Sequence, residues 1–139
     1  MMLVIVSLAV LLGIAPQGVD KTALNEELWN AARAGDGARV TKALDAGADV
    51  NAGNRYKATA LFSAADRGHV EVIKLLLDRG ADINAIDTFY KFRPVMLAVS
   101  NNHDAAVVFL LERGSEGAGT ILAQAAANGK KPLVDAALK

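Results

Sequence analysis

The sequence predicts an all-α solenoid of stacked helix-turn-helix units, and two observations carry this prediction. The first is a repeated segment: GADVNA at residues 47–52 returns as GADINA at residues 80–85, 33 positions further along the chain. The second is that the intervening segment holds two short helical patterns of apolar residues separated by a glycine. A period near 33 residues with paired helices indicates a solenoid, in which each repeat buries its apolar surface against its neighbours.

The second repeat, at about residues 53–85, shows these features most clearly. Apolar residues at i, i+3 and i+4 over residues 61–65 predict a first helix with a narrow apolar face. Gly68 is expected to end this helix, because glycine adopts the left-handed conformation without a clash at Cβ. Residues 70–78 predict a second helix, whose wide apolar stripe includes Leu76.

Three further repeats are expected, at about residues 25–52, 86–114 and 115–139. The first follows a polar hinge at residues 20–24, and its first helix is expected to begin at the N-cap residue Asn25. The first and last repeats carry fewer apolar residues in their second helices than the inner repeats do. This relative polarity is typical of the capping repeats at the two ends of a solenoid.

The third and fourth repeats depart from the pattern at a few positions, but their residues still suit the predicted helices and turns. Asn102 stands where the second repeat has Gly68, and asparagine is the next best residue for a left-handed position. Pro94 is expected at the start of a helix, where its missing N–H costs nothing. The fourth repeat has only residues 114–120 where the earlier repeats have a long loop, so we expect no protruding loop there.

The chain resembles the ankyrin repeat family, whose consensus includes TPLHxAAxxGH and LLLxxGADVNA. Residues 59–85, TALFSAADRGHVEVIKLLLDRGADINA, carry the most specific part of the resemblance, which covers about residues 25–139. The resemblance implies short β-hairpin fingers and a concave partner-binding face made of the finger tips and the exposed ends of the first helices. At the histidine position of TPLH the chain has other residues, which predicts fingers held more by apolar packing than by hydrogen bonds: Trp29, Phe62, Met96 and Ala123. We expect Trp29 to be a buried filler rather than a binding aromatic.

Residues 1–20 are predicted to be a signal peptide or an N-terminal anchor with its hinge. The apolar run at residues 3–15 matches a secretory signal and is shorter than the roughly 20 residues that span a bilayer. No Lys or Arg precedes this run, and Pro16 would follow a cleavage after Ala15. Retention as a membrane anchor, a start further upstream, and an N-terminal helix packed on the first repeat therefore stay open. We expect an exported protein, periplasmic or secreted.

Composition narrows the classes of function. The formal net charge is zero, so no long-range field favours nucleic acid or a membrane surface. The chain has no cysteine, which excludes disulfides, thiol catalysis and cysteine metal sites. We expect no cofactor and no metal, a monomer, and contact with a membrane only through an uncleaved N-terminal segment.

No catalytic constellation is visible. His69 and His103 occupy the same position in consecutive repeats, so we interpret both as structural residues. Ser100 lies near His103 in sequence but lacks a glycine-rich elbow. We therefore predict that the protein is not an enzyme. An unrecognised carboxylate site is the alternative from a different class of function.

The predicted binding residues gather in the two fingers. Their tips, residues 54–57 and 88–93, hold four of the chain's seven aromatic residues beside four basic ones. Loops on a rigid scaffold, and Tyr and Arg in particular, are where binding energy concentrates. With the helix ends that the resemblance adds, the predicted partner-binding residues are Arg33, Arg55, Tyr56, Lys57, Asp66, Arg67, Phe89, Tyr90, Lys91, Phe92, Ser100 and Asn101.

Two alternatives remain at this point. Phe89 and Phe92 could instead pack one finger on the next. The sequence otherwise predicts a non-catalytic module that binds another protein, and the alternative role is a membrane-tethered inhibitor or protective factor for an envelope enzyme.

Overall fold

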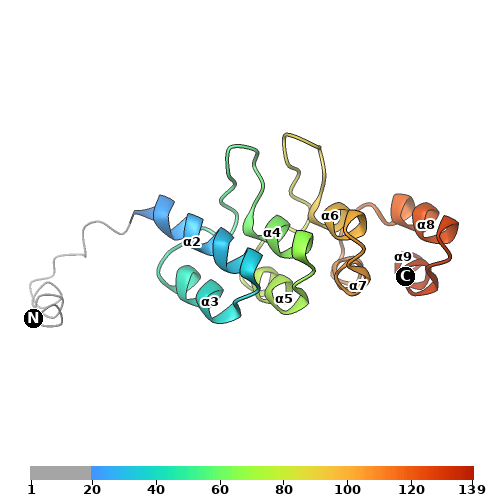
Figure 1. Ribbon diagram of the computed structural model, residues 1–139, viewed down its shortest axis with the longest axis horizontal. Helices are drawn as coiled ribbons and strands as arrows, with labels where there is room; N and C mark the ends of the chain where they lie inside the picture. The colour runs from blue at the N-terminus through green and yellow to red at the C-terminus, as the bar shows by residue number, and fades with distance from the viewer. Residues whose placement is uncertain (1–19) are drawn as a thin grey trace, which may run out of the picture.

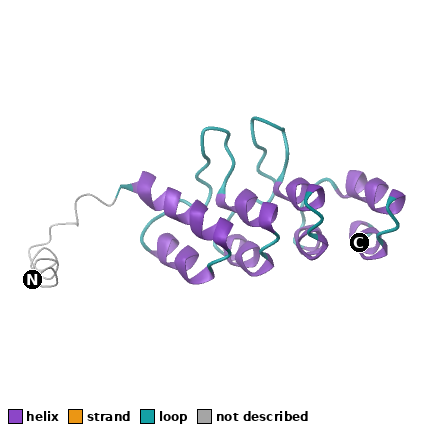
Figure 2. Ribbon diagram, viewed as in Figure 1, coloured by secondary structure: helices purple, strands orange, loops and turns teal. Residues whose placement is uncertain are grey.

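The computed structural model describes residues 20–139, which form eight α-helices stacked in pairs (Figures 1 and 2). The first helices of the pairs make one layer and the second helices make the other, and these residues contain no β-strand. The predicted all-α repeat solenoid is confirmed. The helices are α2 (Lys21–Ala34), α3 (Gly37–Asp45), α4 (Ala60–Arg67), α5 (Val70–Asp78), α6 (Pro94–Ser100), α7 (Asp104–Glu112), α8 (Ala118–Ala127) and α9 (Lys131–Ala137).

The start of the solenoid differs from the sequence expectation. Helix α2 begins at Lys21, and the Asp20 carboxylate caps it by accepting the Thr22 N–H at 2.9 Å. The predicted hinge at residues 20–24 and the N-cap at Asn25 are therefore wrong. Asp20 is as good a cap as Asn25, and no helix breaker stands between them. The Asn25 side chain instead accepts the Asp49 N–H at 2.8 Å, which ties α2 to the loop after α3.

The predicted leader lies outside the described residues, except for its last position. Within residues 20–139, no helix has both the length and the apolar character needed to cross a bilayer.

The core is one continuous cluster of buried side chains that runs from repeat to repeat along the solenoid. Helix α4 packs against α2 and α6, while α5 packs against α3 and α7. Paired alanines let the first helices approach closely, and larger aliphatic side chains fill the space towards the second helices. The fully buried members include Ala31, Ala32, Ala64, Ala65, Leu28, Leu61, Val95, Ile73, Leu76, Val107 and Leu110.

A glycine of one repeat accommodates a histidine of the next. His69 donates its Nε2–H to the Arg33 carbonyl at 3.0 Å, and it packs on Gly35, whose φ is 74°. A Cβ on Gly35 would stand 2.7 Å from His69 Nδ1, so a side chain there would displace the ring. The structural interpretation of this histidine is confirmed by these contacts.

The next two junctions repeat and then vary this arrangement. His103 donates to the Asp66 carbonyl at 2.9 Å, and Gly68 has the same left-handed backbone as its counterpart. At the last junction Asn102 is left-handed, with φ 59°, as the sequence predicts. Lys130 replaces the histidine there, and its Nζ donates to Asn102 Oδ1 at 3.1 Å. A side chain is tolerated at residue 102 because the opposing residue is no longer a ring.

The packing predicts unequal costs for two substitutions on α5. Leu76 is fully buried and Glu71 is exposed. Leu76→Ala should lower the free energy of unfolding by about 2–5 kcal/mol, because it removes buried apolar volume and leaves a cavity. Glu71→Ala should change it by no more than about 0.5 kcal/mol. Denaturant melts measure both values, and equal costs would show that the helix faces are wrongly assigned.

Candidate partner-binding groove

Two loops, here called the first finger (residues 53–58) and the second finger (residues 87–93), rise from the first-helix layer in the same direction (Figure 1). In the first finger, Asn54 N–H donates to the Ala58 carbonyl at 3.0 Å. The Asn54 side-chain oxygen accepts the N–H groups of Tyr56 and Ala58 at 2.8 and 3.2 Å. The finger therefore folds back as a tight hairpin-shaped loop without forming strands.

The second finger is built around a buried carboxylate. Asp87 Oδ1 accepts the N–H groups of Phe89 and Tyr90 at 2.8 and 2.7 Å, and Oδ2 accepts that of Phe92 at 2.7 Å. The residue is only 6 % exposed. The expectation that apolar packing rather than hydrogen bonds would hold the fingers is therefore wrong for this loop. Three donors directed at one carboxylate fix the path of the backbone.

The electrostatics of Asp87 favour its charged form. Burial raises the pKa of this carboxyl, but the three backbone donors and the nearby positive charge of Lys91 outweigh that effect. The net result is a pKa below the ordinary value, as expected for a carboxylate that accepts several backbone hydrogen bonds.

The fingers also contact each other through their aromatic side chains. Thr88 N–H donates to the Tyr56 carbonyl at 2.8 Å, and the rings of Tyr56 and Phe89 meet edge to face with centroids 5.4 Å apart. Phe89 in turn meets Tyr90 edge to face at 4.5 Å, and Tyr90 lies 5.6 Å from Phe92. Phe89 therefore does pack one finger on the other, although it remains 63 % exposed.

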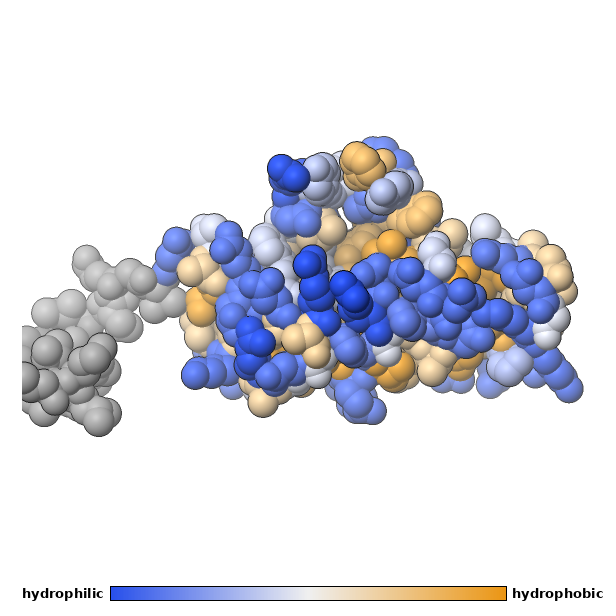
Figure 3. Space-filling model, in the orientation of Figure 1, coloured by the Kyte–Doolittle hydropathy of each residue, from blue (hydrophilic) through white to orange (hydrophobic). Residues whose placement is uncertain are grey.

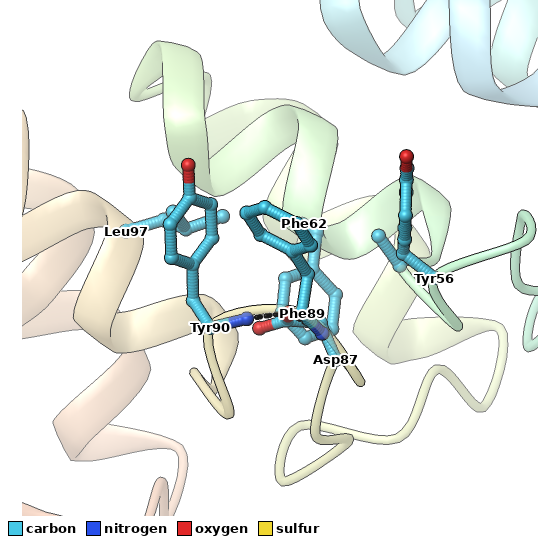
Figure 4. A pocket seen from close by; sticks show the side chains of 7 residues that line it. Tyr56, Phe62, Asp87, Phe89, Tyr90 and Leu97 are labelled. Atoms are coloured by element: carbon cyan, nitrogen blue, oxygen red, sulfur yellow. Dashed lines mark hydrogen bonds between the residues drawn. The ribbon is translucent and has the colours of Figure 1, made fainter.

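A groove of about 320 Å³ opens between the fingers and the first helices α4 and α6. Figure 3 shows hydrophobic surface in the hollow below the fingers. In Figure 4 the rings of Tyr56 and Tyr90 stand on either side of Phe62, with their hydroxyl oxygens towards the same side. We call this space the finger groove, and its lining residues are Tyr56, Ala58, Phe62, Asp87, Phe89, Tyr90 and Leu97.

The predicted helix-end residues continue the same surface. Asp66 follows Phe62 by four positions on α4, and Asn101 follows Leu97 by four positions at the end of α6, so each lies one turn further along the same helix face. The Asn101 amide donates to Asp66 Oδ1 at 2.9 Å, and Arg67 Nε is 3.5 Å from the other Asp66 oxygen. On its helix side, the finger groove is thus bordered by polar side chains that are hydrogen-bonded or ion-paired to one another.

The remaining predicted residues do not all join the finger groove. Arg55 places its guanidinium 4.7 Å from the centre of the Tyr56 ring, at the rim. Lys57 instead lines a separate hollow with Asp82. Arg33 and Ser100 are exposed at the ends of α2 and α6, and Phe92 is half-buried at the base of the second finger.

Four lining residues were not among the predicted binding residues: Ala58, Phe62, Asp87 and Leu97. The clearest sequence signal for one of them is the replacement of the TPLH histidine by Phe62, which puts a large ring where a polar residue is expected. For Asp87 the signal is an aspartate directly before a loop, a position from which its side chain commonly accepts backbone N–H groups.

Trp29, at the equivalent position in the first repeat, is partly buried, packs against the core, and donates its Nε1–H to the Ala52 carbonyl at 3.0 Å. The same position therefore serves packing in one repeat and lines the finger groove in the next.

The groove presents mainly aromatic and aliphatic side chains. Asp87 is the one carboxylate that lines the groove, and its oxygens already accept three backbone donors. Within residues 20–139, no group of three or more His, Cys, Asp or Glu side chains is placed to hold a metal ion.

The fold and the groove together define a helical repeat solenoid that presents ordered loops on one side. The family described as ankyrin repeats (3 copies) matches residues 28–119, and the chain belongs to this family. Ankyrin repeats are generally protein–protein interaction modules and are typically non-catalytic. The search of curated proteins finds no significant match.

The Asp87 hydrogen bonds predict a pH response confined to the second finger. The folded-state pKa of this group is lowered, so its stabilising effect is complete above its ordinary pKa of about 4 and is lost as the pH falls through the lower folded value. Amide NMR resonances of Phe89, Tyr90 and Phe92 should therefore move together below about pH 4.

The control for this titration is Asp87→Asn, in which the side chain no longer ionises and the common shift should disappear. Resonances that move together with a midpoint above about pH 4 would contradict the lowered pKa.

Proposed function

We propose that the chain binds a protein partner through the concave face, with the finger groove at its centre and Tyr56 and Tyr90 as its anchors. The observation that carries this proposal is the arrangement of the two tyrosines. They stand on opposite sides of an apolar groove while 38 % and 64 % of their respective surfaces remain exposed.

Such rings favour association because their conformation is already restricted. Tyr56 contacts Phe89, Phe89 contacts Tyr90, and the backbone of each finger is held by a side-chain acceptor. A partner that covers them therefore buries aromatic area without a large cost in loop ordering. Exposed aromatic residues on rigid loops are also where binding hot spots concentrate.

The direct experiment replaces each tyrosine and measures the affinity of a partner identified by crosslinking in the native envelope. Tyr56→Ala and Tyr90→Ala should each weaken binding by at least about 2 kcal/mol, because each removes a ring that the complex would bury. Their free energies of unfolding should change little, since neither ring belongs to the repeat-to-repeat core.

Charge variants at the rim give a different signature. Arg55→Ala and Lys91→Ala should act mainly on the association rate and on its salt dependence, because rim charges steer encounter more than they hold the complex. Lys74→Ala, on the exposed face of α5, is the matched control and should leave binding unchanged. The proposal fails if both tyrosine variants bind like the parent while the Lys74 variant does not bind.

We also propose that this binding takes place outside the cytoplasm, which rests on the apolar run at residues 3–15. Deletion of residues 1–18 should then leave the protein in the cytoplasm. Fractionation tests the proposal, and a full-length chain found soluble in the cytoplasm with its N-terminus intact would contradict it.

A further inference from the structure

The exposed charges of the two fingers have one sign. Across both fingers the one carboxylate is Asp87, which is buried. The exposed ionised groups are those of Arg55, Lys57 and Lys91, and none of the three takes part in a salt bridge with another described residue. A chain of zero net charge therefore carries a local excess of positive charge where its aromatic residues are exposed.

The second-helix layer gives the contrast. There, two exposed cations of neighbouring repeats each meet a carboxylate: Lys74 meets Asp78 at 2.7 Å and Arg79 meets Asp45 at 2.9 Å. The fingers differ from this part of the surface in that their three exposed cations form no salt bridge with any described residue.

Both fingers hold a lysine in a backbone conformation that favours glycine. Lys57 has φ 58° and Lys91 has φ 59°, at equivalent turns 34 positions apart. A non-glycine residue in this region is strained, because its Cβ comes too close to the following carbonyl oxygen. Such conformations cluster at functional sites, and Lys91 belongs to the finger whose residues Phe89 and Tyr90 line the finger groove.

The size and lining of the groove limit what can enter it. Its volume of about 320 Å³ is at the lower end of the range for small-ligand sites, which is about 300–1,000 Å³. The walls are aromatic and aliphatic, and the carboxylate of Asp87 is engaged by backbone donors. Such a space suits one large apolar side chain rather than a polar or charged group.

We propose that the occupant of the finger groove is an acidic segment of the protein partner, which inserts one aromatic or leucine-sized side chain while neighbouring carboxylates meet Arg55 and Lys91. This inference rests on the function proposed above and adds the chemistry of the partner. Arg55 stands 4.7 Å from the centre of the Tyr56 ring, and Lys91 directly follows Tyr90. A carboxylate adjacent to the inserted side chain therefore meets Arg55 beside Tyr56, while Lys91 adds positive charge to the second finger.

The test is a selection from a random peptide library displayed on phage, with the full-length chain as bait and Tyr90→Ala as counter-selection. Enriched peptides should share a large apolar residue with two or more Asp or Glu residues close to it. A synthetic peptide of the enriched sequence should bind the Tyr90→Ala variant at least about tenfold more weakly, which corresponds to about 1.4 kcal/mol. Its affinity should also fall as salt is raised.

Lys91→Gly separates the contribution of the lysine charge to binding from its effect on stability. The substitution removes the charge and also removes the backbone strain of a side chain at positive φ. The melting temperature should be retained or raised by up to about 4 °C. Peptide affinity should nevertheless fall severalfold. Lys131→Gln is the charge-matched control, because Lys131 is exposed at the start of α9, outside the finger groove, and it should leave peptide affinity unchanged.

Three results would overturn the inference. Enriched peptides could be basic or uncharged, or no peptide could be enriched over the Tyr90→Ala variant. The third is that the full chain binds phosphatidylglycerol vesicles and that the Phe89→Ser variant does not. Because this variant keeps the N-terminal segment unchanged, such a loss would show that the fingers recognise a lipid surface.

Experiments with the crosslinked partner distinguish the proposed protein-binding function from the inference that the bound segment is acidic. If its binding depends on Tyr90 but is not competed by any acidic peptide, the function stands and the acidic segment is wrong. If neither tyrosine matters to the partner, both proposals fall.

Discussion

The hydrogen bond from a histidine of one repeat to a backbone carbonyl of the repeat before it sets the geometry of the two junctions above which the fingers rise. His69 and His103 each reach back to the end of the preceding first helix, at 3.0 and 2.9 Å. The ring fits only because Gly35 and Gly68 leave room for it. This contact spaces the first helices, and the paired alanines then fill the gap between them. Because the same contact recurs, the fingers that precede α4 and α6 leave the helices in the same direction.

The fingers use a second device, in which side-chain oxygens replace the missing β-ladder. Asn54 and Asp87 accept backbone N–H groups inside their own loops, so each finger is ordered without a partner strand. For Asp87 the donors are strong enough to keep a buried carboxylate charged, against the cost of its burial. The backbone strain at Lys91 is tolerated because the N–H groups of residues 89, 90 and 92 all donate to the Asp87 carboxylate and hold the loop in place. Ordered loops with exposed rings follow from this arrangement.

The repeat pattern was sufficient to predict the helix pairs, because helix faces and glycine ends are local properties that recur with the period. The left-handed position of Asn102 could be predicted for the same reason. The start of α2 could not, since two good capping residues stand within five positions and tertiary contacts decide between them. The finger groove was half predicted: loop tips are visible in the sequence, but the approach of Phe62 and Leu97 to them depends on how the fingers lean on α4 and α6. The binding roles assigned to the tips remain predictions.

The central claim is that the finger groove is already formed in the free chain, and amide hydrogen exchange at neutral pH tests it most directly. The N–H groups of Phe89, Tyr90 and Phe92 donate to Asp87, whereas that of Lys91 has no acceptor within residues 20–139. We expect slow exchange for the first three amides and fast exchange for Lys91, in the absence of any partner. Uniformly fast exchange across the second finger would show that the loop is ordered only on binding, and would contradict a preformed groove.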